Sequence, residues 1–273
     1  MFNLFLVELT WNMPLLLCVI GMAVLYGLSL NRLPDIKLYH KQPRFFFLSL
    51  GLLYVTIGSP LTTISHLSFS LHMMQMSILY FIIPPLLLVG IPNQLFQRIR
   101  KTAIAGRIGK WILTPKIALI IFAVMFLMYH LPVVLHVFTQ NPFVHNGYIY
   151  LLFLLSFSMW WPIVSPDPKQ RLGDGQKKQY VFLSGVLLMP ACLLFVISAL
   201  LDGANNPFLT QITALLCMPS QSISIHILPT PFNTKYDQAM AGFLMLGIHK
   251  MSLMATARLG ADRSDTQIEK GDS

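Results

Sequence analysis

The chain has 273 residues, of which 55% are hydrophobic and only 11% are charged. A soluble globular domain carries roughly twice that charged fraction, so the composition excludes an ordinary soluble fold. The net charge of +9 does not indicate a nucleic-acid partner, because the basic residues lie between apolar runs, where they mark the cytoplasmic surface of a lipid bilayer. We therefore predict an all-α polytopic membrane protein.

Seven apolar runs approach the length of roughly 20 residues that a helix needs to cross a bilayer. Because backbone polar groups in lipid need internal partners, we expect each run to be helical. The stretch before the first run lacks the basic residues of a secretory signal peptide and carries the acidic Glu8 instead, so we do not expect a cleaved signal peptide. The predicted spans cover residues 12–30, 45–60, 67–90, 116–137, 147–164, 179–201 and 236–258, within one domain at 1–260 that precedes a short cytoplasmic tail at 261–273.

The basic residues predict the orientation of these spans. Eighteen of the 19 lysines and arginines fall on one side of the alternating spans, and only Lys235 falls on the other. The positive-inside rule then predicts an external N-terminus and a cytoplasmic C-terminus. In the stretch 95–112, apolar residues share one helical face and Arg107 and Lys110 lie off it, which predicts a basic helix on the inner leaflet.

Histidine and methionine gather in the outer parts of the third and fourth predicted spans. At 1.5 Å per residue, His72 lies about 8 Å below the outer boundary, and His130 lies at a similar depth. Met76 follows His72 by one turn on the same helix face, and Met73 and Gln75 flank that face. Imidazole and thioether ligands suit Cu(I) better than hard divalent ions, so copper, as Cu(I), is the expected metal.

Other candidate groups lie on the same predicted side of the membrane. They comprise three possible ligands near the outer boundary, His66, His136 and His145, and four groups that could support the ligands or relay the ion, Asp237, Cys217, Met218 and His226. The plainer alternative stays open. A membrane histidine often hydrogen-bonds a neighbouring helix, and methionine often only fills space.

Prolines and tryptophans have structural interpretations. Pro84, Pro85 and Pro132 are predicted to kink or end the third and fourth helices, because proline lacks the N–H that the helical ladder needs. Trp160 and Trp161 are predicted to lie in an aromatic belt at the inner membrane interface.

Four sequence elements together resemble a known family. They read "SPLTTISHLSFSLHMMQMSILYFIIPPLLLVGIP", "YHLPVVLH", "WWPIVSP" and "KYDQAMAGFLM". In this order they are similar to the CtaG family of bacterial cytochrome c oxidase assembly factors, over roughly residues 11–259. The resemblance implies a seven-helix protein of the bacterial plasma membrane that helps to assemble a heme–copper oxidase, at the step of copper insertion, with oxidase subunits as partners.

Two positions depart from the pattern that the resemblance implies. Many members read HMxxH in the third helix; here His72 matches the first histidine and Met76 replaces the second. Many also read WHLP, where Tyr129 replaces the tryptophan and His130 is kept. The change from histidine to methionine leaves a soft ligand in place and favours Cu(I) further.

Several functions stay open at this point. The chain could hold and deliver copper, or act as a metal-free scaffold for oxidase subunits. A small-ion or proton transporter would use His249, roughly 20 Å down the seventh span, and Asp237. An intramembrane metallo-enzyme would need a base such as Glu8 or Asp202, but the sequence carries no hydrolase or metalloprotease motif, so we do not expect an enzyme.

Two further features stay uninterpreted. The outer segment 202–235 is apolar enough to lie on the membrane surface, as a lid or a docking surface. The small residues Ala23 and Gly27 are spaced for helix contact, but alone they do not support a homodimer.

Overall fold

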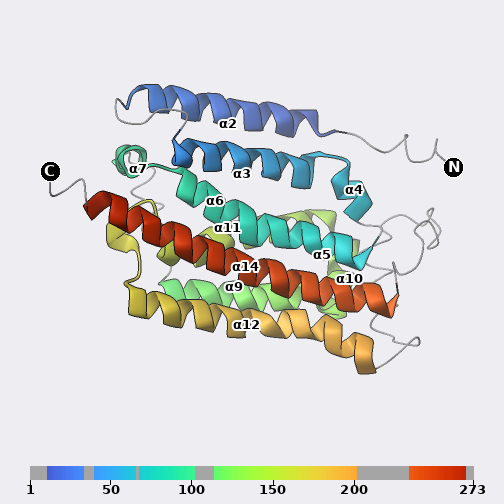
Figure 1. Cartoon of the computed structure of the whole chain (residues 1–273). Helices are drawn as coiled ribbons and strands as arrows, with labels where there is room; N and C mark the ends of the chain where they lie inside the picture. Colours follow the sequence, from blue (N-terminus) through green and yellow to red (C-terminus); the bar gives the residue numbers. More distant parts are fainter. Residues whose placement is uncertain (1–10, 34–39, 66–67, 102–113, 202–233, 269–273) are drawn as a thin grey trace.

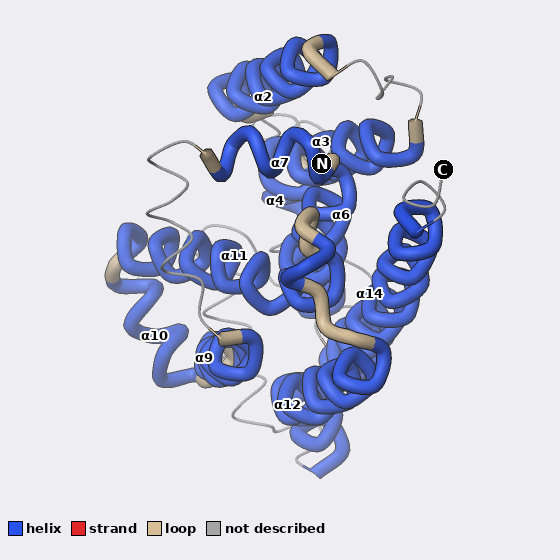
Figure 2. Tube along the Cα trace, turned by 90° about the vertical axis from the view of Figure 1, so that its left-hand side faces the viewer, coloured by secondary structure: helices blue, strands red, loops and turns tan. Residues whose placement is uncertain are grey.

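The computed structural model describes residues 11–33, 40–65, 68–101, 114–201 and 234–268, and every secondary-structure element in these ranges is a helix. Figure 1 shows the long helices running side by side in one bundle, and Figure 2 looks along it. The elements are α2 (Met13–Asn31), α3 (Lys41–Gly58), α4 (Leu61–Ser65), α5 (Phe69–Ser77), η1 (Ile78–Ile82), α6 (Ile83–Gly90), α7 (Asn93–Arg100), α9 (Pro115–Tyr129), α10 (Pro132–Gln140), α11 (Pro142–Val164), η2 (Pro168–Gln170), α12 (Asp174–Leu201) and α14 (Lys235–Ile268).

The all-helical prediction is confirmed for the described residues. Five of their helices are long and apolar enough to cross a membrane: α2, the continuous run α5–η1–α6, α11, α12 and α14. The predicted second span corresponds to α3, which lies outside those five, and the predicted fourth span is divided between α9, with 15 residues, and α10. The count of seven spans and their orientation therefore stay predictions.

The run α5–η1–α6 occupies the centre of the bundle. Of its most apolar window, 72% of the residues are buried, against 17% for α2 at the edge. In Figure 2 the helices α3, α11, α9, α12 and α14 surround this run, while α2 lies outermost. An amphipathic stripe is not needed for such a core, because apolar side chains suit both the protein interior and lipid.

The outermost helix α2 is held at one end by a close approach of α3 and α6. A Cβ atom on Gly90 would lie 2.7 Å from the Phe46 backbone, so only glycine lets α6 approach α3 this closely. Tyr26 of α2 stacks on Phe46 at 3.8 Å between ring centroids and donates its hydroxyl to the Gly90 carbonyl at 2.7 Å. The absence of a side chain on Gly90 thus lets α2, α3 and α6 pack together at this point.

Pro132 ends a helix as predicted, whereas Pro84 and Pro85 do not end theirs. Before Pro132 the chain leaves the α-helix, because Leu131 is extended with φ −85° and ψ 133°, and α10 then begins with Pro132. The fourth span therefore has a break at His130 and Leu131. The third span instead continues past Pro84 and Pro85, with the five-residue π-helix η1 immediately before α6.

Side chains from two other helices satisfy the carbonyls that these prolines leave open. In an α-helix the Tyr80 and Phe81 carbonyls would accept from residues 84 and 85, but both of these are prolines. Trp160 Nε1 of α11 donates to the Tyr80 carbonyl at 3.0 Å, and the Ser252 hydroxyl of α14 donates to the Phe81 carbonyl. The run that contains the two prolines is therefore tied to α11 and α14.

This contact corrects the prediction for Trp160. Its side chain is fully buried and supports the third span, so it does not belong to an interfacial belt. Trp161 is partly exposed, and its ring lies 5.5 Å from that of Phe96 of α7 between centroids, tilted by 59°. Its Nε1–H donates to Gln170 Oε1 at 2.7 Å. A polar partner at the helix end is typical of an interfacial tryptophan.

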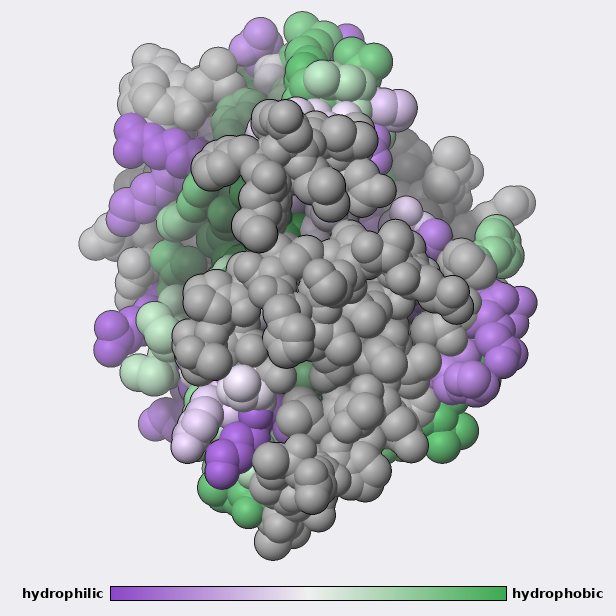
Figure 3. Space-filling view, turned by 90° about the vertical axis from the view of Figure 1, so that its right-hand side faces the viewer, coloured by the Kyte–Doolittle hydropathy of each residue, from purple (hydrophilic) through white to green (hydrophobic). Residues whose placement is uncertain are grey.

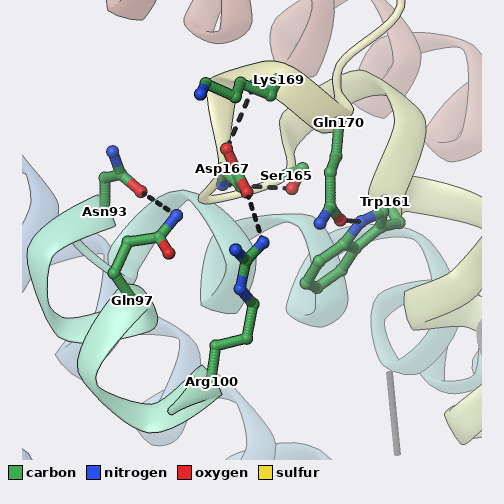
Figure 4. Close-up of polar contacts among 8 residues, drawn as sticks. All are labelled: Asn93, Gln97, Arg100, Trp161, Ser165, Asp167, Lys169 and Gln170. Atoms are coloured by element: carbon green, nitrogen blue, oxygen red, sulfur yellow. Dashed lines mark hydrogen bonds and ion pairs between the residues drawn. The ribbon is translucent and has the colours of Figure 1, made fainter. Parts of the chain in front are cut away.

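The predicted basic surface helix begins as α7, while residues 102–113 lie outside the described part of the chain. Figure 4 shows how α7 is anchored. Arg100 Nη1 forms an ion pair with Asp167 Oδ2 at 3.1 Å, and the Asp167 side chain is buried. The same carboxylate accepts from the Lys169 amide at 3.1 Å, so it fixes both α7 and the turn η2 between α11 and α12.

The orientation can be tested with reporter fusions. We predict that reporters fused after Asn31, Lys101 and Gly175 report the cytoplasm, and that reporters after Gln140 and Asn206 report the outside, because the basic residues cluster around the first three sites. The measurement is paired phosphatase and fluorescent-protein activity for each fusion. An external signal after Lys101 would reverse the orientation.

Candidate functional site

A buried carboxylate sets the start of the helix that carries His72. Asp237, in the first turn of α14, is fully buried and accepts from the backbone amides of Phe69 at 3.0 Å and Ser70 at 3.3 Å. The Ser68 hydroxyl also donates to it at 2.9 Å, as does the Ser70 hydroxyl. Asp237 thus caps α5 from another helix, and its negative charge lies at the positive end of the α5 dipole.

The opposite side of α5 is held by an amide. Gln75 Nε2 donates to the Thr56 carbonyl of α3 at 2.7 Å, and the Ser65 hydroxyl at the end of α4 donates to Gln75 Oε1 at 2.6 Å. Gln75 therefore uses both ends of its amide to join α3, α4 and α5. Together with the Asp237 cap, this contact fixes the position of the first turns of α5, where His72 lies.

His72 and His145 meet at one hydroxyl. The Tyr129 hydroxyl, at the end of α9, lies 3.4 Å from His72 Nε2 of α5 and 3.3 Å from His145 Nε2 of α11. Both imidazoles lie nearly parallel to the Tyr129 ring, at 19° and 17°. The hydroxyl has one proton, so it donates to one imidazole and accepts an N–H from the other, which gives the two histidines different protonation patterns.

His130 lies next to this cluster but faces a different way. Its side chain is fully buried, and its Nδ1 lies 2.6 Å from the Phe126 carbonyl, to which it donates. Its ring meets the edges of Tyr129 and of Phe195 on α12, each at 5.3 Å between centroids. Nε2 is buried without a hydrogen-bond partner among the described residues, so its lone pair is available to a ligand.

The remaining predicted site residues are distributed unevenly. Met73 and Met76 are buried in the core beside the His72 turn. His136 is exposed on α10, where its Nε2 lies 3.0 Å from Gln140 Nε2. No group of three or more histidine, cysteine or acidic side chains that could hold a metal occurs in the described ranges. Four of the predicted residues lie outside those ranges: His66, Cys217, Met218 and His226.

Sequence reasoning missed the role of Tyr129. It appeared only as a replacement for tryptophan beside His130, and nothing in its spacing reveals a contact with His72, which is 57 positions away. A phenol at this position provides what an indole does not, a group that can donate to one imidazole and accept from another. Tyr129 therefore joins the site as the residue that connects α5, α9 and α11.

The site lies near the end of the bundle formed by α4, α10 and the start of α14 (Figure 1). Figure 3 views the molecule from this end, and the described side chains around its rim include both strongly hydrophilic and hydrophobic residues. The His72, Tyr129 and His145 cluster therefore lies near one end of the bundle.

The fold and the site together define an all-helical protein whose long helices are apolar enough to cross a membrane, with imidazole, phenol and thioether groups buried near one end of the bundle. The model of the cytochrome c oxidase caa3 assembly factor family, Caa3_CtaG, matches residues 24–259. The chain belongs to this family, as its sequence motifs indicated. Comparison with curated proteins gave no match, and comparison with solved structures gave none either.

The Asp237 cap can be tested by stability. Asp237→Ala leaves two backbone amides and two hydroxyls without their buried acceptor, so we expect it to destabilise the protein by roughly 2 kcal/mol or more. The measurement is thermal unfolding of the purified protein in detergent. Asp174→Ala, at the exposed first turn of α12, is the matched control and should change stability by less than about 0.5 kcal/mol. Equal effects of the two substitutions would contradict the capping role.

Proposed function

We propose that this assembly factor holds Cu(I) near the outer face of the bacterial plasma membrane and delivers it to a copper centre of a heme–copper oxidase. The observation that carries the proposal is the convergence of His72 and His145 on the Tyr129 hydroxyl, with both Nε2 atoms within 3.4 Å of one oxygen. A metal ion that displaced the hydroxyl would meet both nitrogens.

The donor chemistry fits Cu(I). The donor groups of this region are the buried His72, the half-buried His145 and the thioethers of Met73 and Met76 in the adjoining turns of α5, all without charge. The carboxylate at this end, Asp237, is already occupied by α5. Calcium and magnesium need several oxygen ligands, so the site does not favour them.

His130 supports the proposal by the state of its two ring nitrogens. A metal-binding imidazole usually donates its second N–H to a fixed acceptor, which orients the ring and leaves the other lone pair for the metal. His130 has this arrangement, because Nδ1 is bonded to the Phe126 carbonyl and Nε2 is buried without a partner among the residues described. It could take the ion from the Tyr129 cluster or share it.

A metal-free scaffold is the second candidate function. It is favoured by the lack of a cluster of three strong ligands in the described ranges and by the many apolar side chains that the bundle exposes. Along α14, for example, Phe243, Met251 and Met254 are each at least 60% exposed. Such a face could pack against a helix of an oxidase subunit by van der Waals contact.

Metal binding can be measured on purified variants. We expect His72→Ala and His130→Ala each to lose most of the Cu(I) that the Tyr129 cluster retains under reducing conditions, and Met76→Ala to weaken this retention, because imidazole supplies the stronger bonds. Met76→His should retain copper, since it replaces one soft ligand with another. The control is His40→Ala, on the loop before α3. If both histidine variants keep the copper content and the thermal stability of wild type, copper binding at this site is contradicted and the scaffold function is favoured.

Delivery and scaffolding can be separated in cells. If the chain delivers copper, His72→Ala cells should make oxidase subunits that reach the membrane but lack copper and activity, and added external copper should restore part of the activity. A scaffold would fail differently, because the subunits would be degraded and copper would not help. The measurement combines subunit abundance, bound copper and oxidase activity in the same membranes. Intact activity in His72→Ala, or loss of subunits at every copper level, refutes delivery through this site.

A further inference from the structure

A second buried histidine lies outside the proposed site. His249, in the middle of α14, is 1% exposed, and its Nε2 lies 3.3 Å from the Ser184 hydroxyl of α12. Its ring lies 4.8 Å from that of Phe81, the residue whose carbonyl Ser252 supports. This histidine is 12 positions, or roughly 18 Å, along the helix from Asp237, so it lies well away from the Tyr129 cluster.

The ring nitrogens of His249 repeat the arrangement found in His130. Nδ1 is buried without a hydrogen-bond partner among the described residues. If Nδ1 carried the proton, a buried N–H donor would go unmet, which is costly, so the favoured tautomer donates Nε2–H to Ser184 and leaves a lone pair on Nδ1. Ser184 then fixes the ring as the outer hydrogen bond of a metal ligand does.

A thioether lies one turn from this lone pair. Met245 precedes His249 by four residues on α14 and is fully buried. Helical side chains lean toward the N-terminus, so the His249 ring lies over the turn that carries Met245. A Cβ atom on Gly242 would lie 2.7 Å from the Cys192 carbonyl of α12, and His249 contacts Ser184 of the same helix. The turn of α14 that carries Met245 therefore packs against α12 between these two levels.

The residue that follows His249, Lys250, places its ammonium near the buried Gly185 of α12, one position from Ser184, so a cation at His249 meets its repulsion. A singly charged ion meets less of this repulsion than a divalent ion does. Hard divalent ions would need oxygen ligands, whereas the imidazole and thioether here are neutral and soft.

We propose that His249 Nδ1 and Met245 Sδ form a second Cu(I) site, deeper in the bundle than the Tyr129 cluster and between α12 and α14. The inference deepens the proposed copper function and rests on it for its biological meaning, although its ligands are separate. With two sites at different depths, the chain would hold one ion in its interior and another near the outer surface.

The test is a Cu(I) titration of the full-length protein in detergent with reductant, against a competing chromogenic Cu(I) chelator. We expect two bound equivalents for wild type, one for His72→Ala, one for His249→Ala, and none for the double variant. Ser184→Ala should weaken the inner site about tenfold or more, as loss of an outer hydrogen bond to a metal ligand does. Met245→Leu, which conserves volume, should weaken it too, whereas Met251→Leu on the exposed face of α14, 72% exposed, should not.

A spectroscopic readout separates ligation from folding. In the His72→Ala background, X-ray absorption at the copper edge should show a sulfur neighbour that Met245→Leu removes and Met251→Leu keeps. Wild-type stoichiometry in both His249→Ala and Met245→Leu, or an unchanged sulfur signal, overturns the inner site. If His72→Ala keeps both equivalents while His249→Ala loses one, the outer site fails and the inner site stands, so the two proposals are tested independently.

Discussion

The arrangement of the bundle depends on a carboxylate buried where a helix begins. The four N-terminal amides of a helix need acceptors, and inside a membrane protein water does not supply them. Asp237 provides the acceptor for α5 from the first turn of α14, across 168 positions of sequence. A buried carboxylate is costly unless its charge is compensated, and here two amides, two hydroxyls and the α5 dipole compensate it. The position of His72 follows from this contact, because it lies in the first turn and a half of α5.

At the proline pair, too, side chains from other helices supply hydrogen bonds that the helix backbone lacks. Pro84 and Pro85 remove two hydrogen bonds from the most buried helical run, and Trp160 and Ser252 replace the missing donors. The π-helix η1 contains Tyr80 and Phe81, whose carbonyls have lost their helical donors. Short π-helical segments of this kind often occur near functional sites. The defect therefore joins α5–η1–α6 to α11 and α14, and it places Phe81 against His249.

Helix content and the family could be predicted from the sequence, but the contacts of the site could not. Composition and run length predict helices in a membrane, and the effect of Pro132 is local, so it too was predictable. Depth estimates placed His72 and His130 at a similar level, and both lie beside Tyr129 in the structure. The depth of a residue along a helix, however, does not say in which direction around the helix axis its side chain points. The helix faces that meet are set by packing between distant segments, which is why Tyr129 was missed and Trp160 was misplaced.

Asp237 shows the same limit in a sharper form. The sequence suggested that it supports the metal ligands or relays an ion. The structure shows a cap for a different helix. A carboxylate in the first turn of one helix can also stabilise the start of a neighbouring helix, and one sequence cannot tell which helix benefits.

The two attachments of α14 also bear on mechanics. Asp237 holds the start of α5 and Ser252 holds its continuation at η1, so α14 and the central run are clasped at two points and would move as one stiff body. The helix α9, which brings Tyr129 to the His72 and His145 cluster, has no such pair of attachments to α5–η1–α6 among the described residues. Tyr129 is the last residue of α9, and the helical ladder is interrupted directly after it. A rotation about His130 and Leu131 would therefore change the angle of α10, while the phenol stays with α9, which packs against α11 and α12.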